Sequence, residues 1–337
     1  MNIMLFRVDG GKVWGISMGH IKRSLILSTA LAKNKYRVIY IMKNYPDGVA
    51  YVRQYGFYVD TIDVEDNSDD CLIALCKKYS PKHVIIDIFH LYYNVFFQYA
   101  RENSIQTIVF DTLGNCVGQP DILFNDSLVS KFTDYSHLNG KTKTFIGPKF
   151  FMIEDTPEIV QISNDKVQNI MITMGGSDPA GLTIKILRSM IERLLEFNVN
   201  VVLGPSFNEE KDVYALLETR HSVVIYKNPE NFLNLLSRQD IVISSAGRTL
   251  YECAYFGRPS IIVPSIEHER ETAKEYAKHV DVFDVGLWDE MLSPDKIFRA
   301  ITQYKNNYYL RKNAFTLGRT LVDGSGLKRI IRIINNN

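Results

Sequence analysis

Gly19 and His20 stand where an apolar run gives way to a predicted helix. The run Ile3 to Phe6 indicates a strand, a glycine-containing loop extends from Asp9 to Gly19, and the helix would open with His20. A helix N-terminus offers unpaired N–H groups and partial positive charge, which favour a phosphate or a developing anionic oxygen. An imidazole at that edge can accept a proton near neutral pH. We therefore predict that His20 is a catalytic base, although a lone histidine at a helix start is more often a cap or a surface residue.

Two later turns repeat this strand, small-residue turn and helix pattern. The segments 169–173 and 240–243 indicate strands, and they are followed by Met174 to Pro179 and by Ser244 to Thr249. Small residues at such turns let backbone amides approach a diphosphate, to which Arg248 adds a charge and Thr249 a hydroxyl. The residues that we expect to bind substrate are Asp9, Gly19, Gly175, Gly176, Ser177, Ser245, Ala246, Gly247, Arg248, Thr249, Glu252, His268 and Glu269.

Several of these side chains have a second interpretation. Glu252 could accept both hydroxyls of a ribose, as acidic residues do in dinucleotide folds, or it could merely offset a helix dipole. His268 and Glu269 could serve acid–base chemistry, sugar binding or, less readily, a metal, and a solvated helix start fits them equally well. Asp9, Asp87 and Asp111 each end an apolar run, where an aspartate is usually a cap or turn former.

Apolar strands that alternate with helices recur along the whole chain. This pattern predicts an α/β protein with parallel sheets covered on both faces, and such sheets bind ligands beyond the carboxyl ends of their strands. The polar stretch 154–167, which contains Pro157, separates two such series. We therefore predict two Rossmann-like, doubly wound domains, residues 1–153 and 165–337.

Composition narrows the classes of function. The chain has 337 residues, 46% of them hydrophobic and 23% charged, with a formal net charge of +1. The small net charge argues against a nucleic-acid surface, and there is no apolar run long enough to insert stably in a membrane. The start of the sequence does not read as a signal peptide, so we expect a cytoplasmic protein with reduced thiols. Neither zinc-like spacing nor another metal motif is present, and the sequence leaves the oligomeric state open.

The chemistry-bearing segments together resemble the GT-B architecture, in which two Rossmann-like lobes face each other across a cleft. More narrowly, they resemble the UDP-2,4-diacetamido-2,4,6-trideoxy-β-L-altropyranose hydrolase family of the pseudaminic acid pathway and the related spore-coat polysaccharide proteins. The segments that carry the resemblance are Arg7-Val8-Asp9, Gly19-His20-Ile21-Lys22-Arg23, Gly147-Pro148-Lys149, Met174-Gly175-Gly176-Ser177-Asp178-Pro179 and Ala246-Gly247.

This resemblance implies an activity and a role for each domain. Members of the family use water, without a metal or cofactor, to cleave the anomeric bond of the UDP-sugar with inversion. The catalytic histidine of the family falls on His20 in the N-terminal domain. The phosphate turns fall on Gly175 and Gly176 and on 245–249, with the ribose site at Glu252 and the uracil loop at 226–228, all in the C-terminal domain.

The sequence departs from the family pattern at several points. Ser17 stands where the family usually has a glycine, and Phe89 stands where it has a sugar-site tyrosine. Arg248 replaces one glycine of a pair, and His268-Glu269 replace an Asn-Gln pair. The nucleotide-sugar class is therefore better supported than the particular sugar. A glycosyltransferase that deprotonates a sugar or lipid hydroxyl is the alternative enzyme, and a non-catalytic nucleotide-sugar sensor is the alternative from another class.

Overall fold

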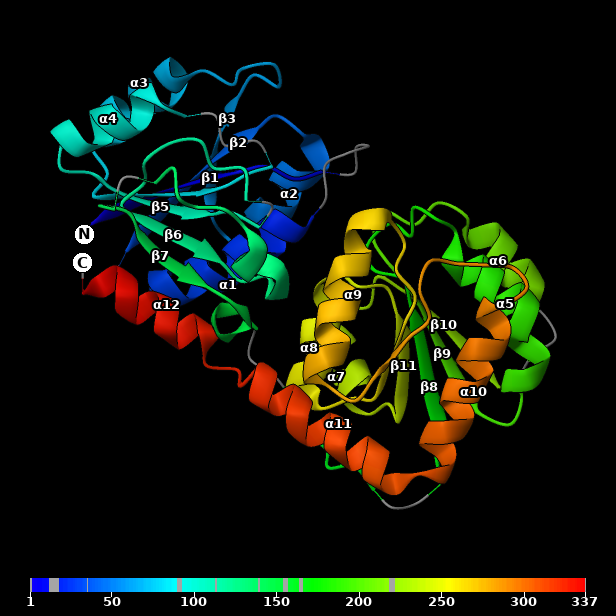
Figure 1. Ribbon diagram of the computed structural model, residues 1–337. Coiled ribbons are helices and arrows are strands. Elements are labelled where there is room, and N and C mark those ends of the chain that lie inside the picture. Colours follow the sequence, from blue (N-terminus) through cyan, green and yellow to red (C-terminus); the bar gives the residue numbers. More distant parts are fainter. Residues whose placement is uncertain are drawn as a thin grey trace. The chain divides into compact units, whose positions relative to one another are not determined.

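The computed structural model describes residues 2–11, 18–34, 36–89, 93–112, 114–138, 140–153, 157–163, 166–217 and 222–336. The chain forms two compact units (Figure 1). The first unit comprises Met1–Glu154 and Ser325–Asn337, and the second comprises Asp155–Gly324. The sequence predicts domains of 1–153 and 165–337, whereas in the structure the chain divides after Glu154 and Ser325–Asn337 group with the first unit.

Within its described residues, the first unit contains a seven-stranded parallel sheet in the order β3-β2-β1-β4-β5-β6-β7. Its strands are β1 (Ile3–Val8), β2 (Arg37–Lys43), β3 (Tyr58–Ile62), β4 (His83–Asp87), β5 (Gln106–Phe110), β6 (Ile122–Asn125) and β7 (Lys143–Ile146). Its helices are α1 (Gly19–Lys33), α2 (Pro46–Gln54), α3 (Asp69–Tyr79), α4 (Val95–Glu102) and α12 (Gly326–Asn335), with the 3₁₀ turns η1 (Leu128–Phe132) and η2 (Pro148–Phe150).

Strand β1 shows why this sheet is covered on both faces. Met4 and Phe6 pack into the core that α1, α2 and α12 share, whereas Leu5 packs into the core beneath α3 and α4. Successive side chains of a strand point to opposite faces, so a continuous apolar run requires helices on both sides. Figure 1 shows α3 and α4 on one face of the sheet and α1 and α12 on the other.

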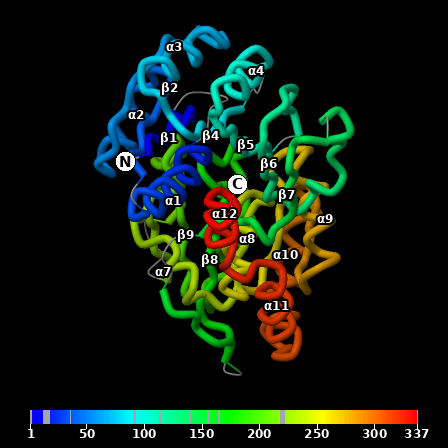
Figure 2. Tube along the Cα trace, turned by 90° about the vertical axis from the view of Figure 1, so that its left-hand side faces the viewer, coloured from blue at the N-terminus to red at the C-terminus, as the bar shows by residue number. Residues whose placement is uncertain are grey.

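Helix α12 completes the core of the first unit. Ile330 and Ile334 are 0% and 1% exposed and pack in the same core as α1. Gly326 lies so close to η2 that a Cβ at this position would be 2.1 Å from the carbonyl oxygen of Phe151. Figure 2 shows α12, in red, beside α1, in blue. The end of the chain is therefore a structural part of the N-terminal unit.

The described residues of the second unit form a six-stranded parallel sheet in the order β10-β9-β8-β11-β12-β13. Its strands are β8 (Asn169–Thr173), β9 (Asn198–Leu203), β10 (Val223–Lys227), β11 (Ile241–Ser244), β12 (Ser260–Ile262) and β13 (Phe283–Asp284). Its helices are α5 (Leu182–Leu194), α6 (Glu210–Leu217), α7 (Phe232–Ser237), α8 (Arg248–Phe256), α9 (Glu267–His279), α10 (Ser293–Asn306) and α11 (Tyr308–Leu321). Helices α5, α6 and α10 cover one face, and α8, α9 and α11 lie on the other (Figure 1).

The linker between the units is fixed to the second unit at its described residues. Arg258 is 3% exposed, and its guanidinium donates to the carbonyl oxygens of Gln239 and Val160. Arg311, which is also buried, donates to the carbonyl oxygen of Ser163 at 3.2 Å. Residues 157–163 contain neither helix nor strand, as the polar composition predicts, while 154–156 and 164–165 lie outside the described part.

Candidate functional site

Each sheet has one point at which the strand order reverses, and the predicted residues gather there. In the first unit this point lies between β1 and β4, where Val8 pairs with Asp87. In the second it lies between β8 and β11, where Thr173 pairs with Ser244. Ligands of open parallel sheets bind outside the carboxyl ends of the strands at such a reversal. A ligand is therefore expected at the turns that follow β1, β4, β8 and β11.

In the first unit, the imidazole of His20 contacts the carboxylate of Asp87. Nδ1 of His20 lies 2.5 Å from Oδ1 of Asp87, and the side chains are 19% and 1% exposed. His20 is the second residue of α1, whose first turn contains no acidic residue. A proton on Nδ1 that is donated to Asp87 leaves the lone pair on Nε2, so this contact selects the tautomer that a general base requires.

Arg23 holds the Asp87 carboxylate from the other side. Its Nε and Nη2 donate to the two oxygens of Asp87 at 2.8 and 2.6 Å, and its Nη1 donates to Thr112 and Asp126 at 2.8 and 3.1 Å. Burial alone would raise the pKa of the Asp87 carboxyl, but the charges and hydrogen bonds of Arg23 and His20 hold this pKa well below its usual value. Asp87 therefore remains an anion that orients the imidazole throughout the neutral range.

Asp9 occupies the carboxyl end of β1, as predicted, but both of its oxygens bind within the protein. Nη1 and Nη2 of Arg7 donate to them at 2.5 and 2.7 Å, and the backbone N–H of Lys43 donates to Oδ1 at 2.9 Å. Nε of Arg7, which is 1% exposed, also donates to the hydroxyl of Tyr93. These bonds hold the carboxyl ends of β1 and β2 together. A direct contact of Asp9 with the substrate stays a prediction. Most of the loop that follows, residues 12–17 with Ser17, lies outside the described residues.

Asp111 has the turn-forming role that is usual for an aspartate at the end of a strand. Its two carboxylate oxygens accept from the backbone amides of Gly114, Asn115 and Cys116 at 2.8 to 3.1 Å. The side chain is 1% exposed. Of the three aspartates at strand ends, Asp87 is the one whose carboxylate contacts His20 in the described part of the chain.

The first glycine turn of the second unit, after β8, packs against the end of β9. Gly175 has φ = +78°, a conformation that favours glycine. A Cβ on Gly204 would lie 2.3 Å from the carbonyl oxygen of Gly175 and 2.4 Å from that of Gly176, and the N–H of Ser206 donates to the latter oxygen at 2.9 Å. Gly204 is thus a residue that the motif analysis missed, although its position directly after a strand was a detectable signal.

Ser177 and Asp178 differ in their surroundings. Ser177 is exposed, beside the exposed Gly176. Asp178 is buried, and its oxygens accept from the backbone amides of Leu182 and Thr183, both at 2.8 Å, so it caps α5. The exposed part of this turn is therefore the pair Gly176 and Ser177, which is where a ligand could approach.

The second glycine turn of this unit leads into α8. Gly247 is the N-cap residue of this helix, Arg248 and Thr249 are its first two residues, and its first turn contains no acidic residue. Ser245 lies against the other turn, because a Cβ on Gly175 would be 3.6 Å from its hydroxyl oxygen. The reversal point thus brings Gly175, Ser245 and Gly247 together at a helix N-terminus, an arrangement suited to an anion. Glu252 lies in the second turn of α8 and is partly buried.

His268 and Glu269 both lie in the first turn of α9 but have different environments. His268 is exposed, whereas the carboxylate of Glu269 turns inward. Oε2 of Glu269 accepts from the backbone N–H of Ser265 at 2.7 Å, and the backbone N–H of Ala246 also bonds to this carboxylate. Glu269 thus joins the Ala246 turn to the start of α9.

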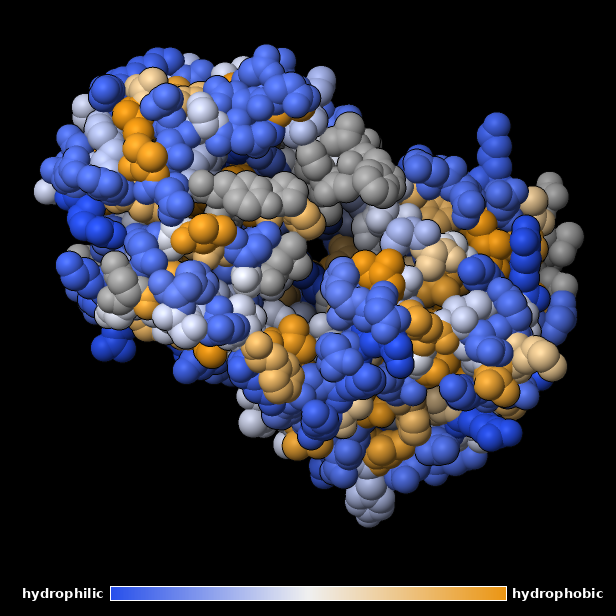
Figure 3. Space-filling view, turned by 45° about the horizontal axis from the view of Figure 1, so that its top comes forward, coloured by the Kyte–Doolittle hydropathy of each residue, from blue (hydrophilic) through white to orange (hydrophobic). Residues whose placement is uncertain are grey.

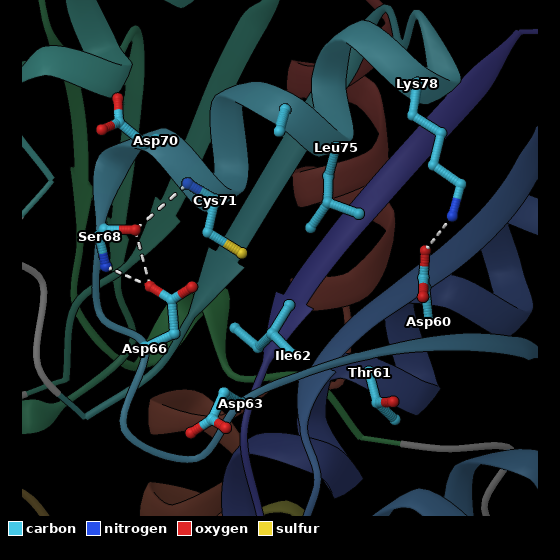
Figure 4. Close-up of a pocket in the computed structure, with 11 residues that line it drawn as sticks. Asp60, Thr61, Ile62, Asp63, Asp66, Ser68, Asp70, Cys71, Leu75 and Lys78 are labelled. Carbon is cyan, nitrogen blue, oxygen red and sulfur yellow. Dashed lines mark hydrogen bonds and ion pairs between the residues drawn. The ribbon is translucent and has the colours of Figure 1, made fainter.

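A pocket of about 530 Å³ lies elsewhere in the first unit, between β3 and α3 (Figure 4). None of the predicted site residues lines it. Its polar groups are engaged with one another, since Lys78 pairs with Asp60 at 2.8 Å and the hydroxyl of Ser68 donates to Asp66 at 2.7 Å. Burial and the neighbouring Asp66 raise the pKa of the Cys71 thiol to about 11, so this cysteine is a poor nucleophile.

Four further properties of the described residues concern metal ligands, membrane-spanning helices, the surface and the cysteine thiols. They contain no group of three or more His, Cys, Asp or Glu side chains placed to hold a metal ion. None of their helices combines the length and apolar character that crossing a membrane requires. Hydrophobic side chains appear in scattered patches among hydrophilic ones on the face in Figure 3. All four cysteines are free thiols.

The comparisons with known proteins agree with this architecture. Residues 169–314 match the family model of the glycosyltransferase family 28 C-terminal domain. An uncharacterized protein of Methanocaldococcus jannaschii is 32% identical over 286 residues, which cover 81% of this chain and 57% of that protein. The chain therefore spans little more than half the length of this relative.

Two further relatives are more distant. The spore coat polysaccharide biosynthesis protein SpsG of Bacillus subtilis is 23% identical over 100% of this chain and 98% of its own length. The pseudaminic acid cytidylyltransferase and UDP-2,4-diacetamido-2,4,6-trideoxy-β-L-altropyranose hydrolase of Helicobacter pylori is 27% identical over 42% of this chain and 26% of its length.

Solved structures show the same fold at low sequence identity. MurG of Acinetobacter baumannii has a TM-score of 0.68 at 14% identity and covers 100% of this chain and 99% of its own. The UDP-GlcNAc 2-epimerase of Neisseria meningitidis has a TM-score of 0.64 at 15% identity, with full coverage of both chains. The protein thus has the GT-B fold of two parallel-sheet α/β domains, and its second unit matches the glycosyltransferase family 28 C-terminal domain.

Proposed function

We propose that this protein is a nucleotide-sugar hydrolase that cleaves the anomeric C–O bond of a UDP-activated diacetamido-trideoxyhexose in nonulosonic (pseudaminic) acid or surface polysaccharide biosynthesis. The observation that carries the proposal is the chain of contacts His20–Asp87–Arg23 at the reversal point of the first sheet. The names of the Helicobacter and Bacillus relatives support the pathway class. The free thiols agree with a cytoplasmic location.

In the proposed reaction, His20 acts on water. Nε2 of His20 removes a proton while the water oxygen bonds to the anomeric carbon from the face opposite the diphosphate. The bond between that carbon and the diphosphate oxygen breaks, and UDP leaves with the electron pair. The free sugar therefore has inverted configuration, and the proton on the imidazole passes to solvent. Base catalysis of this kind contributes about 10² to 10⁴-fold.

The second unit would hold the leaving group. Amides at the N-terminus of α8 and the glycine turn after β8 would contact the diphosphate, with Arg248 and Thr249 adding a charge and a hydroxyl. Because UDP departs as an anion, stabilisation of its charge lowers the barrier without a metal. Ser177, Ser245 and Ala246 would complete this contact surface, with Glu252 on the ribose and His268 facing the sugar side.

A glycosyltransferase is the second candidate, and one observation favours it. Residues 169–314 match a glycosyltransferase C-terminal domain, and the same histidine could deprotonate an acceptor hydroxyl in place of water. Phe89, which follows Asp87 by two residues, is 46% exposed and could contact such an acceptor. The two candidates share the donor, the base and the leaving group, so only the acceptor distinguishes them.

Phosphorus and proton NMR of the purified protein with the UDP-sugar, in the absence of any acceptor, tests the proposal. A hydrolase releases UDP and the free sugar in equal amounts, with inverted configuration in the first product formed. The His20→Ala variant should lose this release, whereas His279→Ala, at a histidine that is 42% exposed on α9, should retain it. Saturable UDP-sugar binding without release of UDP would favour the transferase. If no acceptor then produces turnover, the result would favour a sensor.

A further inference from the structure

We propose that Glu269 couples the binding of the nucleotide diphosphate to the uptake of one proton by the second unit. This inference rests on the proposed function, because it assumes that the diphosphate binds at the N-terminus of α8. It assigns Glu269 a role different from direct contact with the substrate: the side chain positions the binding turn and adjusts its charge when the ligand arrives.

The contacts of Glu269 place its carboxylate at that turn. Oε2 accepts from the N–H of Ser265 at 2.7 Å, and the N–H of Ala246 also bonds to the carboxylate. Oε1 lies 3.8 Å from the position that a Cβ on Gly247 would occupy. Because Gly247 is the N-cap residue of α8, a diphosphate at this helix would bring its charge close to that of Glu269.

The surroundings of Glu269 raise the pKa of its carboxyl above the ordinary value. Burial raises the pKa of its carboxyl, the two backbone amides and His268 lower it, and Asp178 raises it, with a net upward shift. Asp178 lies on the turn after β8, and His268 precedes Glu269 on α9. Arg248 and Glu252 are the charged residues of the first two turns of α8. The carboxylates of Asp178 and Glu252 therefore flank the two turns that would bind the diphosphate.

A bound diphosphate would strengthen this upward shift. Its negative charges disfavour the carboxylate by the same mechanism as Asp178, so the pKa of Glu269 is higher in the complex than in the free protein. A group whose pKa rises on binding takes up a proton, and the affinity then falls as the pH rises between the two values. Protonated Glu269 can still accept from the N–H of Ser265 through its carbonyl oxygen, so this contact is kept.

Isothermal titration calorimetry with UDP-N-acetylglucosamine tests this coupling. Its diphosphate, unlike that of UDP, does not titrate near neutral pH. We expect the binding enthalpy of the wild-type protein to depend on the ionisation enthalpy of the buffer, with an uptake on the order of half a proton at its maximum, at a pH between the pKa of Glu269 in the free protein and its pKa in the complex. The affinity should fall severalfold across this range.

Two variants separate the coupling from a structural role. Glu269→Gln keeps a carbonyl acceptor for the amides but cannot titrate, so its proton uptake should vanish and its affinity should respond less to pH. Glu271→Gln alters a carboxylate two residues later that is 66% exposed, and it should retain the wild-type uptake.

The outcomes are distinguishable from a failure of the proposed function. Binding without proton uptake, or with an uptake that persists in Glu269→Gln, overturns this inference and leaves the UDP-sugar proposal intact. Absence of any UDP-sugar binding by the wild-type protein overturns both. Proton uptake that disappears in Glu269→Gln alone supports the coupling, and a merely structural role of Glu269 would not produce this result.

Discussion

His20 and Asp87 are 67 residues apart in sequence, and their side chains meet at 2.5 Å where the strand order of the first sheet reverses. Asp87 is the last residue of β4, and His20 is the second residue of α1. The fold therefore supplies both a base and the anion that orients it.

Replacing His20 by alanine should lower turnover by about 10² to 10⁴-fold, because the general base is lost. Binding of the UDP-sugar should change little, since the proposed diphosphate contacts lie in the second unit. Single-turnover NMR or a UDP-release assay measures the first quantity, and calorimetry measures the second. Unchanged turnover would refute the assignment of His20.

Replacing Asp87 by asparagine should lower turnover on the order of 10³-fold, because the amide no longer selects the productive tautomer of His20. It also leaves the buried Arg23 with less compensating charge, at a cost of about 3 kcal/mol in the free energy of unfolding. Urea denaturation measures this loss. Asp295→Asn, which removes a surface ion pair with Arg193, is the control and should leave the denaturation midpoint almost unchanged.

The stability of the protein should also depend on the charge of Asp87. Because the folded-state pKa of this carboxyl lies below its unfolded value, it contributes stability that is complete above the unfolded pKa and is lost as the pH falls through the folded one. The unfolding free energy of the wild type should therefore fall more steeply between about pH 5 and about pH 2 than that of Asp87→Asn. Parallel pH dependences would contradict the pairing.

Gly204→Ala and Gly176→Ala should distinguish the contribution of the first glycine turn to stability from its contribution to UDP-sugar binding. A Cβ on Gly204 meets two backbone carbonyls, so we expect lower thermal stability and weaker UDP-sugar binding. A Cβ on Gly176 has no neighbour within 4 Å, so we expect unchanged stability and weaker binding, because the methyl group enters the exposed space proposed for phosphate. Thermal unfolding and calorimetry measure the two effects. Full binding by Gly176→Ala would argue against a phosphate contact there.

Ile330→Ala should destabilise the first unit by about 2 to 4 kcal/mol, because Ile330 is fully buried in the core beneath α1. Hydrogen exchange should show lower protection in β1 and β2 and unchanged protection in β8 and β9. Lys328→Ala, at an exposed position of the same helix, is the control. Equal effects in both units would mean that α12 does not belong to the first core.

The sequence predicted the elements whose pattern is local. Continuous apolar runs such as 84–87 and 169–173 became buried parallel strands, and the glycine turns begin helices where expected. Helix α2 and strand β3 were missed, because a proline-led helix and a short, half-exposed edge strand lack clear periodicity. The segment 145–149, whose Gly147-Pro148 pair indicates a turn, contains the end of β7 and the start of the 3₁₀ turn η2, so the short edge strand before the turn was missed.

The parts of the site that the sequence did not reveal depend on contacts between distant residues. Arg23 was recognisable as part of a motif, but its bonds to Asp87 and Asp126 span 64 and 103 residues. The position of Gly204 directly after a strand indicates a turn, but its contact with the turn 28 residues earlier is not visible in the sequence pattern. The sequence did not reveal which core covers α12, because helical periodicity identifies an apolar face and leaves the partner of that face undefined.

The return of α12 to the first unit has a consequence for biosynthesis. During translation, residues 1–153 emerge before α12, so their core lacks Ile330 and Ile334 until the second unit and α12 have also left the ribosome. The second unit is one continuous stretch, Asp155–Gly324, and so it can fold to completion before the first. In topological terms it is an insertion within the N-terminal unit, and a fragment that ends before α12 would display an unfilled apolar groove to chaperones and proteases.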